Sequence, residues 1–278
     1  AYTPDLAASL NNLAIYLDNN GQQREALTTA QEAVTIRRNL AEHNPAAYTP
    51  DLAASLNNLA IYLDSNGQQR EALTTAQEAV TIRRNLAEHN PAAYTPDLAA
   101  SLNTLANRLD SNGQQREALT TAQEATNLYR TLAKHNPAAY TPDLAGSLNT
   151  LAIYLDSNGQ QREALTTAQE ATNLYRTLAK HNPAAYTPDL AGSLNTLANR
   201  LDSNGQQREA LTTAQEATNL YRTLAKHNPA AYTPDLAMSL KTYANVLERS
   251  GSTKEAARIR QVRDEVLKRM KEMEEHDA

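Results

Sequence analysis

The sequence predicts an all-α protein, an α-solenoid built from six helix-turn-helix repeats. The string AYTPDLA recurs with a 46-residue period across the 278 residues, starting at Ala1, Ala47, Ala93, Ala139, Ala185 and Ala231. The composition agrees, because 49 alanines and 37 leucines stand beside only 8 glycines, which favours helices. Phe, Trp and Cys are absent, so neither an aromatic-centred core nor a disulfide framework is available.

We expect a single repeat domain over residues 1–278, because each unit of such an array packs mainly on its neighbours. The predicted repeats are 1–46, 47–92, 93–138, 139–184, 185–230 and 231–278, the last with a C-terminal capping helix. Repeats one and two differ only at Asn19 and Ser65. Similarity this close indicates recent duplication or deliberate assembly of an excised or engineered array, and both origins stay open.

The first helix of each repeat is predicted to begin at the Thr-Pro-Asp segment, residues 3–5 in repeat one. Thr suits the N-cap, Pro suits the first helical position, and Asp faces the positive end of the helix dipole. An apolar stripe follows at spacings of four, three and four residues, formed by Leu6, Leu10, Leu13 and Leu17. This helix should stop at Asn20–Gly21, because Gly adopts the left-handed conformation that closes a helix.

The second helix is predicted to start at Gln22 or Gln23 and to end at the His-Asn-Pro segment, residues 43–45. Pro cannot continue a helix and also restricts the residue before it. The short link 46–48 should then lead into the next helix start at Thr49–Pro50. Small side chains on both helices allow close approach of the backbones, namely Ala14, Ala26, Ala30 and Ala33.

These positions carry a family resemblance. The small residue in the first helix, the turn glycine and the alanines of the second helix resemble the tetratricopeptide repeat, at Ala14, Gly21, Ala26 and Ala30 in repeat one. The 46-residue period is similar to the long repeats of kinesin light chains and of bacterial relatives. The resemblance implies a right-handed superhelix that acts as a non-enzymatic scaffold for protein–protein interaction.

The resemblance also implies that the inner face of the first helices lines a concave groove that binds a peptide or protein segment. Carried onto this sequence, the implied groove residues are Asn11, Ile15, Asn57, Ile61, Asn103, Asn107, Arg108, Asn149, Ile153, Asn195, Asn199, Arg200, Lys241 and Asn245. An asparagine recurs once per repeat, and its carboxamide suits pairing with the backbone of an extended peptide. The alternative is that these asparagines bond across adjacent first helices and order the stack.

The second helix differs between repeats as a block, from residues 34–39 to residues 126–131, and within the first helix one adjacent pair of positions stands out. Ile-Tyr at 15–16, 61–62 and 153–154 is replaced by Asn-Arg at 107–108 and 199–200. Variation on one helical face beside constant packing positions is expected if that face is adapted to partners. Neutral drift at exposed positions is the other interpretation.

No residue pattern points to catalysis, a cofactor or a metal site. The histidines recur once per repeat at a helix end, and neighbouring copies about 10 Å apart cannot share one metal ion. Phosphate-binding glycine loops and nucleophile motifs are absent from the sequence. The net charge of −5 gives no basic footprint for nucleic acid, and no apolar run is long enough for a membrane span. We therefore expect a soluble, cytoplasmic protein that is not an enzyme.

The two ends of the array differ in sequence. The last repeat carries many charged residues, with Ile259, Val262, Val266 and Met270 left to face inward, as expected of a polar cap. Repeat one matches an interior repeat, so we expect an uncovered apolar edge at Leu6 and Leu10. That edge predicts end-to-end self-association, and it supports a second hypothesis in which the chain is a structural or designed array without a specific ligand.

Overall fold

The computed structural model describes residues 3–276. Within that range it contains twelve α-helices and no strand, and the helices form six antiparallel hairpins. The predicted all-α array of helix hairpins is therefore confirmed. The hairpins fall into two compact units, Ala1–His135 and Asn136–Ala278, which are described separately.

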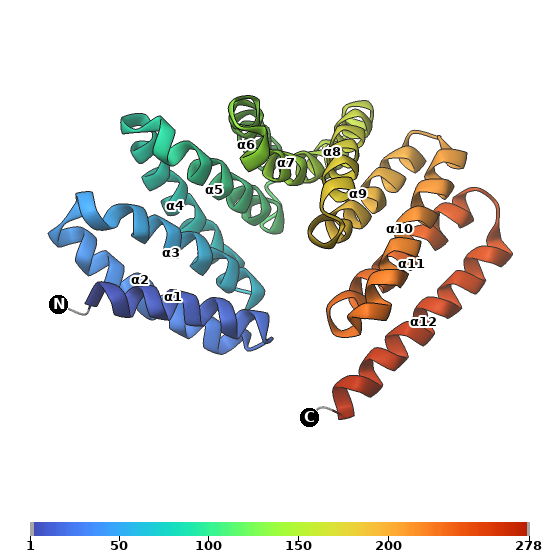
Figure 1. The fold of residues 1–278 in the computed structure, drawn as a ribbon, viewed down its shortest axis with the longest axis horizontal. Helices are drawn as coiled ribbons and strands as arrows, with labels where there is room; N and C mark the ends of the chain where they lie inside the picture. The colour runs from blue at the N-terminus through green and yellow to red at the C-terminus, as the bar shows by residue number, and fades with distance from the viewer. Residues whose placement is uncertain (1–2, 277–278) are drawn as a thin grey trace. The chain divides into compact units, whose positions relative to one another are not determined.

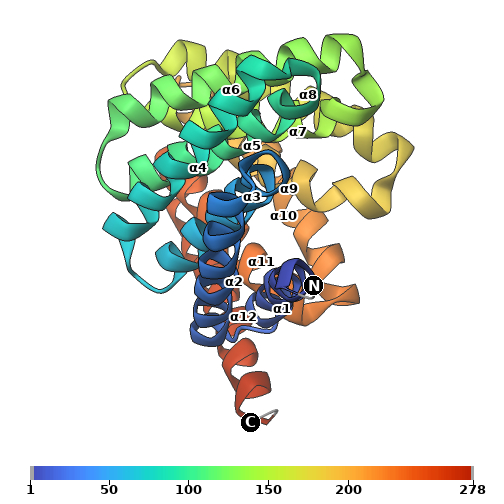
Figure 2. The ribbon, with the colours of Figure 1, turned by 90° about the vertical axis from the view of Figure 1, so that its left-hand side faces the viewer.

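The first unit holds three hairpins, and each helix packs on the next one along the chain. Figures 1 and 2 show α1 beside α2 at the start of this unit. The helices of the unit are α1 (Thr3–Asn19), α2 (Gln23–His43), α3 (Pro45–Ser65), α4 (Gln69–His89), α5 (Pro91–Ser111) and α6 (Gln115–His135). The first helices α3 and α5 also contact each other directly.

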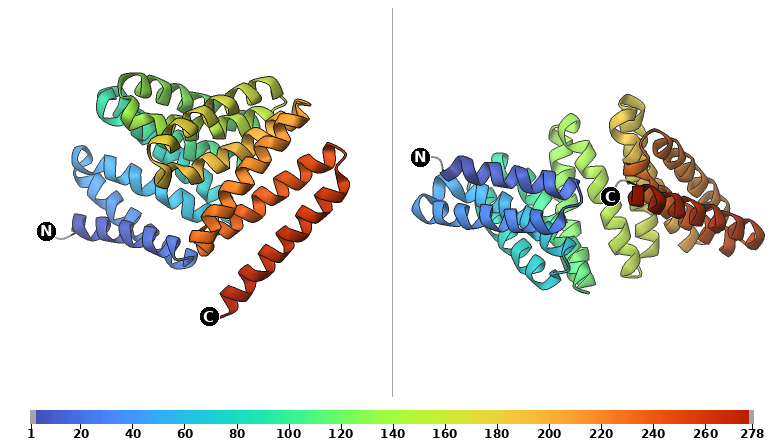
Figure 3. Two further views of the ribbon diagram at one scale, coloured as in Figure 1. Left: turned by 45° about the vertical axis from the view of Figure 1, so that its right-hand side comes forward. Right: turned by 90° about the horizontal axis from the view of Figure 1, so that it is seen from below.

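The second unit repeats this arrangement. Its helices are α7 (Pro137–Ser157), α8 (Gln161–His181), α9 (Pro183–Ser203), α10 (Gln207–His227), α11 (Pro229–Arg249) and α12 (Thr253–His276). The first helix α9 contacts both α7 and α11. Figure 3 shows α11 and α12 packed side by side, with the longer α12 extending beyond its partner.

The turn inside every hairpin follows the predicted geometry. Its glycine has a positive φ in each repeat, between 76° at Gly21 and 85° at Gly251. In this conformation the glycine amide bonds back to the carbonyl three residues earlier, as Gly21 N does to Asp18 O at 2.9 Å. A side chain would be strained there, which explains why glycine recurs at this position.

The predicted start of the first helices was wrong for five of the six hairpins. These helices begin at the proline of the His-Asn-Pro segment, so a single residue separates consecutive hairpins. In repeat two the Asn44 side chain caps α3 by accepting a hydrogen bond from Ala47 N at 3.3 Å, and Pro45 takes the first helical position. Pro50 lies inside the helix. The cap and the two alanines after Pro45 outweigh the one intrahelical bond that Pro50 cannot make.

The interior of each hairpin is built from the predicted alanines and leucines. Ala14, Ala26 and Ala33 are fully buried, and Leu56 of α3 is 1% exposed. Alanine at the helix crossings lets backbones approach closely, and leucine fills the space between hairpins. In the last hairpin, Ile259, Val262 and Val266 of α12 pack on the α10–α11 core, as expected of a capping helix.

Candidate functional site

The first-helix face, formed by the odd-numbered helices of each unit, carries the exposed apolar side chains. Among the described residues, every large apolar side chain that is exposed lies on a first helix, at Leu6, Leu13, Ile15, Tyr16, Ile61, Ile153 and Met238. The isoleucines that the sequence placed in a groove are 37–40% exposed. The matching positions in other repeats hold Asn107 and Asn245, which are exposed, and Asn199, which is half-buried. A single face therefore offers both apolar and amide contacts to solvent.

The recurring asparagine lies beside these positions and is half-buried in five repeats. Its carbonyl oxygen accepts a hydrogen bond from a serine of the next first helix, since Ser55 Oγ lies 3.2 Å from Asn11 Oδ1 and Ser101 Oγ lies 3.1 Å from Asn57 Oδ1. One end of these two carboxamides thus orders the stack, as the alternative interpretation expected. Asn103 and Asn149 occupy equivalent places, and Lys241 is exposed in the last repeat.

From the second repeat onward, the second residue of each variable pair lies between hairpins. Tyr62 and Tyr154 are 5% and 4% exposed. Arg108 and Arg200, which the sequence placed in the groove, have side chains only 12% exposed and pair with carboxylates of the preceding first helix. The distances are 3.0 Å from Arg108 Nη1 to Asp64 Oδ2 and 2.5 Å from Arg200 Nη1 to Asp156 Oδ2. A residue next to an exposed isoleucine is rotated by about 100° around the helix, which turns it toward the neighbouring hairpin.

Consecutive hairpins meet at a seam, the contact between the second helix of one hairpin and the first helix of the next. The seams are of two kinds. In the first unit a buried arginine of the second helix bonds to the next first helix. Arg83 Nη1 donates to Asp97 O at 2.7 Å and to Ser101 Oγ at 2.7 Å, and Arg37 repeats these contacts one hairpin earlier. Burial lowers the pKa of both arginines from the ordinary value, although each stays protonated at neutral pH.

In the second unit the seam contains hydroxyl groups. Thr172 Oγ1 lies 2.9 Å from Ser193 Oγ, and Thr218 Oγ1 lies 3.1 Å from Ser239 Oγ. Tyr175 and Tyr221 take the places of the arginines, and burial raises the pKa of both phenols. Burial also raises the pKa of the nearby carboxyl groups, at Asp143, Asp189 and Asp235.

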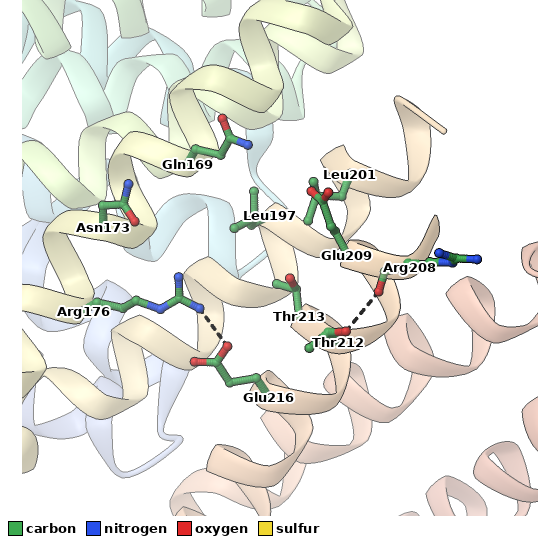
Figure 4. A pocket seen from close by; sticks show the side chains of 10 residues that line it. All are labelled: Gln169, Asn173, Arg176, Leu197, Leu201, Arg208, Glu209, Thr212, Thr213 and Glu216. Atoms are coloured by element: carbon green, nitrogen blue, oxygen red, sulfur yellow. Dashed lines mark hydrogen bonds and ion pairs between the residues drawn. The ribbon is translucent and has the colours of Figure 1, made fainter. Parts of the chain in front are cut away.

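The second-helix face, formed by the even-numbered helices of a unit, has a different character. An arginine of one second helix pairs with a glutamate of the next, with distances of 2.6 Å for Arg38–Glu78, 2.6 Å for Arg84–Glu124 and 2.7 Å for Arg176–Glu216. Between α8 and α10 a pocket of about 540 Å³ opens beside the last of these pairs. Figure 4 shows its lining, which includes Leu197 and Leu201 of α9 and the charged Arg176, Arg208, Glu209 and Glu216. Opposite charges balance in this pocket.

The repeated histidines sit at helix ends, as the sequence indicated. His43 Nδ1 lies 2.6 Å from Asn39 O and His89 Nδ1 lies 2.7 Å from Asn85 O, so each ring bonds a carbonyl of its own last turn. Among the side chains that the structure describes, no cluster of three or more His, Asp or Glu residues could hold a metal ion. Within residues 3–276, no helix combines the length and the apolar character needed to cross a membrane.

Sequential hairpins with one apolar and amide-rich face define a helical-repeat protein of the kind that presents long surfaces to other molecules. Residues 6–45, 52–91 and 98–137 match the model of the tetratricopeptide repeat. Residues 185–230 repeat residues 93–138 with one difference, Gly192 in place of Ala100. The repeats within residues 6–137 are therefore tetratricopeptide repeats, a fold that is commonly a non-enzymatic scaffold for protein interaction.

Solved structures share this fold. The crystal structure of BtubC (BKLC) from P. vanneervenii superposes with a TM-score of 0.68 at 20% identity and covers 90% of this chain and 92% of BtubC. The nearly identical TPR-like repeats of a kinesin light chain-like protein from Podosopora anserina superpose with a TM-score of 0.59 at 23% identity. That comparison covers 81% of this chain and 98% of the other. No curated protein matches the sequence of this chain.

The sequence did not reveal two features of these surfaces. Leu13 and Tyr16 of α1 are 46% and 67% exposed, more than the half-buried Leu10 that was expected to form the edge. The pockets between second helices were also missed. The sequence does carry a signal for them, because each paired arginine and glutamate are 40 residues apart. This spacing indicates a contact only when consecutive second helices are already known to lie beside each other.

Proposed function

We propose that the first-helix face binds an extended segment of another protein. The observation that carries this proposal is the restriction of exposed large apolar side chains to the first helices among the described residues. Apart from the α1 edge described below, these side chains include an isoleucine at the same position of three repeats, Ile15, Ile61 and Ile153, and apolar side chains exposed on one face can mark an interaction site. The common use of the family as a protein-interaction scaffold supports the same reading.

The chemistry of the face suggests what such a segment offers. Ile15 and Ile61 precede Asn107 in the first unit, whereas Ile153 precedes Asn199 and Asn245 in the second. Apolar side chains of the ligand would pack on the isoleucines, and polar side chains or backbone groups would bond to the asparagines. No metal, cofactor or catalytic group enters this function.

The test is selection of binding peptides from a displayed library on the full chain. Ile61→Asn places the residue of repeats three and five into repeat two, and we expect it to weaken binding about tenfold, the value of one buried apolar side chain. Thr81→Asn makes the matching exchange on the second-helix face, where Asn127 stands in repeat three, and should leave binding unchanged. Equal effects of the two substitutions would contradict the proposal.

The asparagine row gives a second test of the same surface. Replacing Asn103, Asn149 and Asn195 together with Ala removes carboxamides but leaves the isoleucines in place. Weaker peptide binding with an unchanged unfolding curve would support direct contact with the ligand. Unchanged binding would show that these asparagines serve only the stack.

Self-association through α1 is a second proposal, which rests on a separate observation. Leu6, Leu13 and Tyr16 are 46–67% exposed, whereas the equivalent residues of α3 are 5–8% exposed because the first hairpin covers them. We expect a concentration-dependent dimer in sedimentation equilibrium, with one α1 edge covering another. Leu6→Arg and Leu10→Arg should each shift the equilibrium toward the monomer. A strict monomer at high concentration would overturn this proposal.

A further inference from the structure

The second-helix face contains two equivalent pockets in the second unit, and they differ in charge. The pocket between α8 and α10 has a counterpart of about 610 Å³ between α10 and α12. Every residue that lines the second pocket stands 46 positions after a residue of the first pocket: Arg222, Lys254, Glu255, Arg258, Ile259 and Val262. The first pocket is therefore an internal reference for the second.

Two differences between the pockets change their charge. Val262 stands where the first pocket has Glu216, so Arg222 lacks the carboxylate that pairs with Arg176. Arg258 stands where the first pocket has Thr212, which adds a cation. The lining residues of the second pocket thus comprise three cations and one carboxylate, Glu255, which keeps the place of Glu209.

Among the side chains that the structure describes, no carboxylate neutralises these cations by direct contact. Arg222 Nη1 donates a hydrogen bond to Asn219 Oδ1 at 3.2 Å, and none of the three cations forms an ion pair with a side chain that the structure describes. Other arginines of this hairpin do find partners, such as Arg249 with Asp202 and Arg260 with Glu248. Unpaired like charges around one pocket repel each other, and an anion bound between them would relieve that repulsion.

We infer that the pocket between α10 and α12 binds carboxylate side chains of an acidic protein segment. Arg222 and Arg258 would hold the carboxylates, because guanidinium groups bind them in a bidentate geometry. The half-buried Ile259 and Val262 would receive an adjacent apolar side chain of the same segment. This apolar lining favours a peptide over a nucleic acid, and the chain carries a net charge of −5. The site lies on the second-helix face and does not depend on the function proposed for the first-helix face.

The binding test uses the full chain and a fluorescent eight-residue peptide in which Asp and Glu flank one Leu. The control peptide replaces Asp by Asn and Glu by Gln. We expect at least tenfold tighter binding of the acidic peptide, weakening as salt is raised. Equal binding of both peptides would overturn the inference. Tighter binding of a phosphoserine peptide or of single-stranded DNA than of the acidic peptide would overturn the choice of ligand.

Variants locate the site. Val262→Glu restores the residue of the reference pocket and should lower affinity at least tenfold. Because Val262 also packs on the core, Arg222→Gln gives an independent test at an exposed position and should have a similar effect. Conversely, Thr212→Arg with Glu216→Val should convert the reference pocket into a second site and raise the stoichiometry from one peptide to two. Unchanged affinity in Arg222→Gln, or an unchanged stoichiometry in the double variant, would contradict the assignment.

Discussion

The seams of the first unit depend on buried guanidinium groups, whereas the seams of the second unit depend on hydroxyl groups. Arg83 supplies the protons for its seam, so Ser101 accepts from Arg83 and still donates to Asn57 Oδ1. Thr218 and Ser239 have two hydroxyl protons between them but make three contacts, to Ala214 O, to each other and to Asn195. At the same position of the repeat, Ser101 of the first unit accepts from a charged donor, whereas Ser239 of the second unit shares hydroxyl protons with Thr218.

This difference reaches the first-helix face. In the structure Ser239 Oγ donates to Asn195 Oδ1 at 2.9 Å, which leaves no hydroxyl proton for the contact between Thr218 and Ser239. Oxygen and nitrogen of a carboxamide are assigned from the bonding network, so we expect Asn195 to turn its NH₂ group toward Ser239 instead. Asn149 of the same unit has a buried Oδ1 without a hydrogen-bond partner. We therefore expect the seam to set whether an asparagine turns its NH₂ group or its carbonyl toward solvent.

Removal of one seam arginine should have the largest effect on local stability. Arg83→Ala leaves Ser101 and the Asp97 carbonyl without their charged donor, and we expect it to lower the opening free energy of α4–α5 by about 3 kcal/mol. Native-state hydrogen exchange of the full chain measures this locally, with the α8–α10 amides as an internal control. A loss below about 1 kcal/mol would show that the guanidinium groups do not hold the first unit together.

Removal of a seam hydroxyl should cost less. Thr218→Val keeps the shape of the side chain but removes its bond to Ser239, and we expect a loss of about 1 kcal/mol in the opening free energy of α10–α11. Exchange of the same amides provides the measurement. A loss as large as that of Arg83→Ala would erase the distinction between the two kinds of seam.

Exchange of one seam for the other should have a smaller effect still. The double substitution Val80→Thr and Arg83→Tyr gives the first unit the seam residues of the second unit. We expect the opening free energy to change by less than about 1 kcal/mol, because both versions satisfy their polar groups. Ala54 occupies the position that Gly146 holds against Tyr175, and the third repeat already combines alanine and tyrosine at these positions, as Ala100 and Tyr129. Full unfolding of the first unit in this variant would show that each seam needs further matched residues.

The pH dependence should be the weakest effect on stability. Burial raises the pKa of Asp235 beside Tyr221, so this carboxyl holds its proton more strongly in the folded chain than in the unfolded chain. The free energy of unfolding should therefore fall as pH rises above about 4, through the raised pKa of Asp235. Asp235→Asn should remove this contribution, making the variant the more stable chain at pH 7 but not at pH 3.5 in urea titrations. A wild-type advantage at pH 7 would contradict the sign.

The orientation of the carboxamides can be measured without a change in stability. We expect slower solvent exchange for the side-chain NH₂ protons of Asn195, bonded to Ser239, than for those of Asn57. Nuclear magnetic resonance of selectively labelled asparagine separates the two signals. Equal exchange rates would mean that both carboxamides have the same orientation.

The sequence predicted the elements better than the surfaces. The 46-residue period and the turn glycines located all six hairpins, because those signals are local. The start of the first helices was misjudged because two Pro-containing segments five residues apart each resemble a helix start, and only the cap at Asn44 distinguishes them. Exposure could not be predicted locally, since Tyr16 and Tyr62 have identical neighbours in sequence but are 67% and 5% exposed. Stacking decides which copy is covered.

The most direct test of the central claim, that the first-helix face binds protein segments, is hydrogen–deuterium exchange of the full chain with a bound peptide. The peptide should be selected on the Arg222→Gln variant, so that the cationic pocket does not contribute. We predict slower exchange in the first helices, chiefly α3 and α5 or α7 and α9, with α4 and α8 unchanged. Protection confined to the second helices would contradict the account.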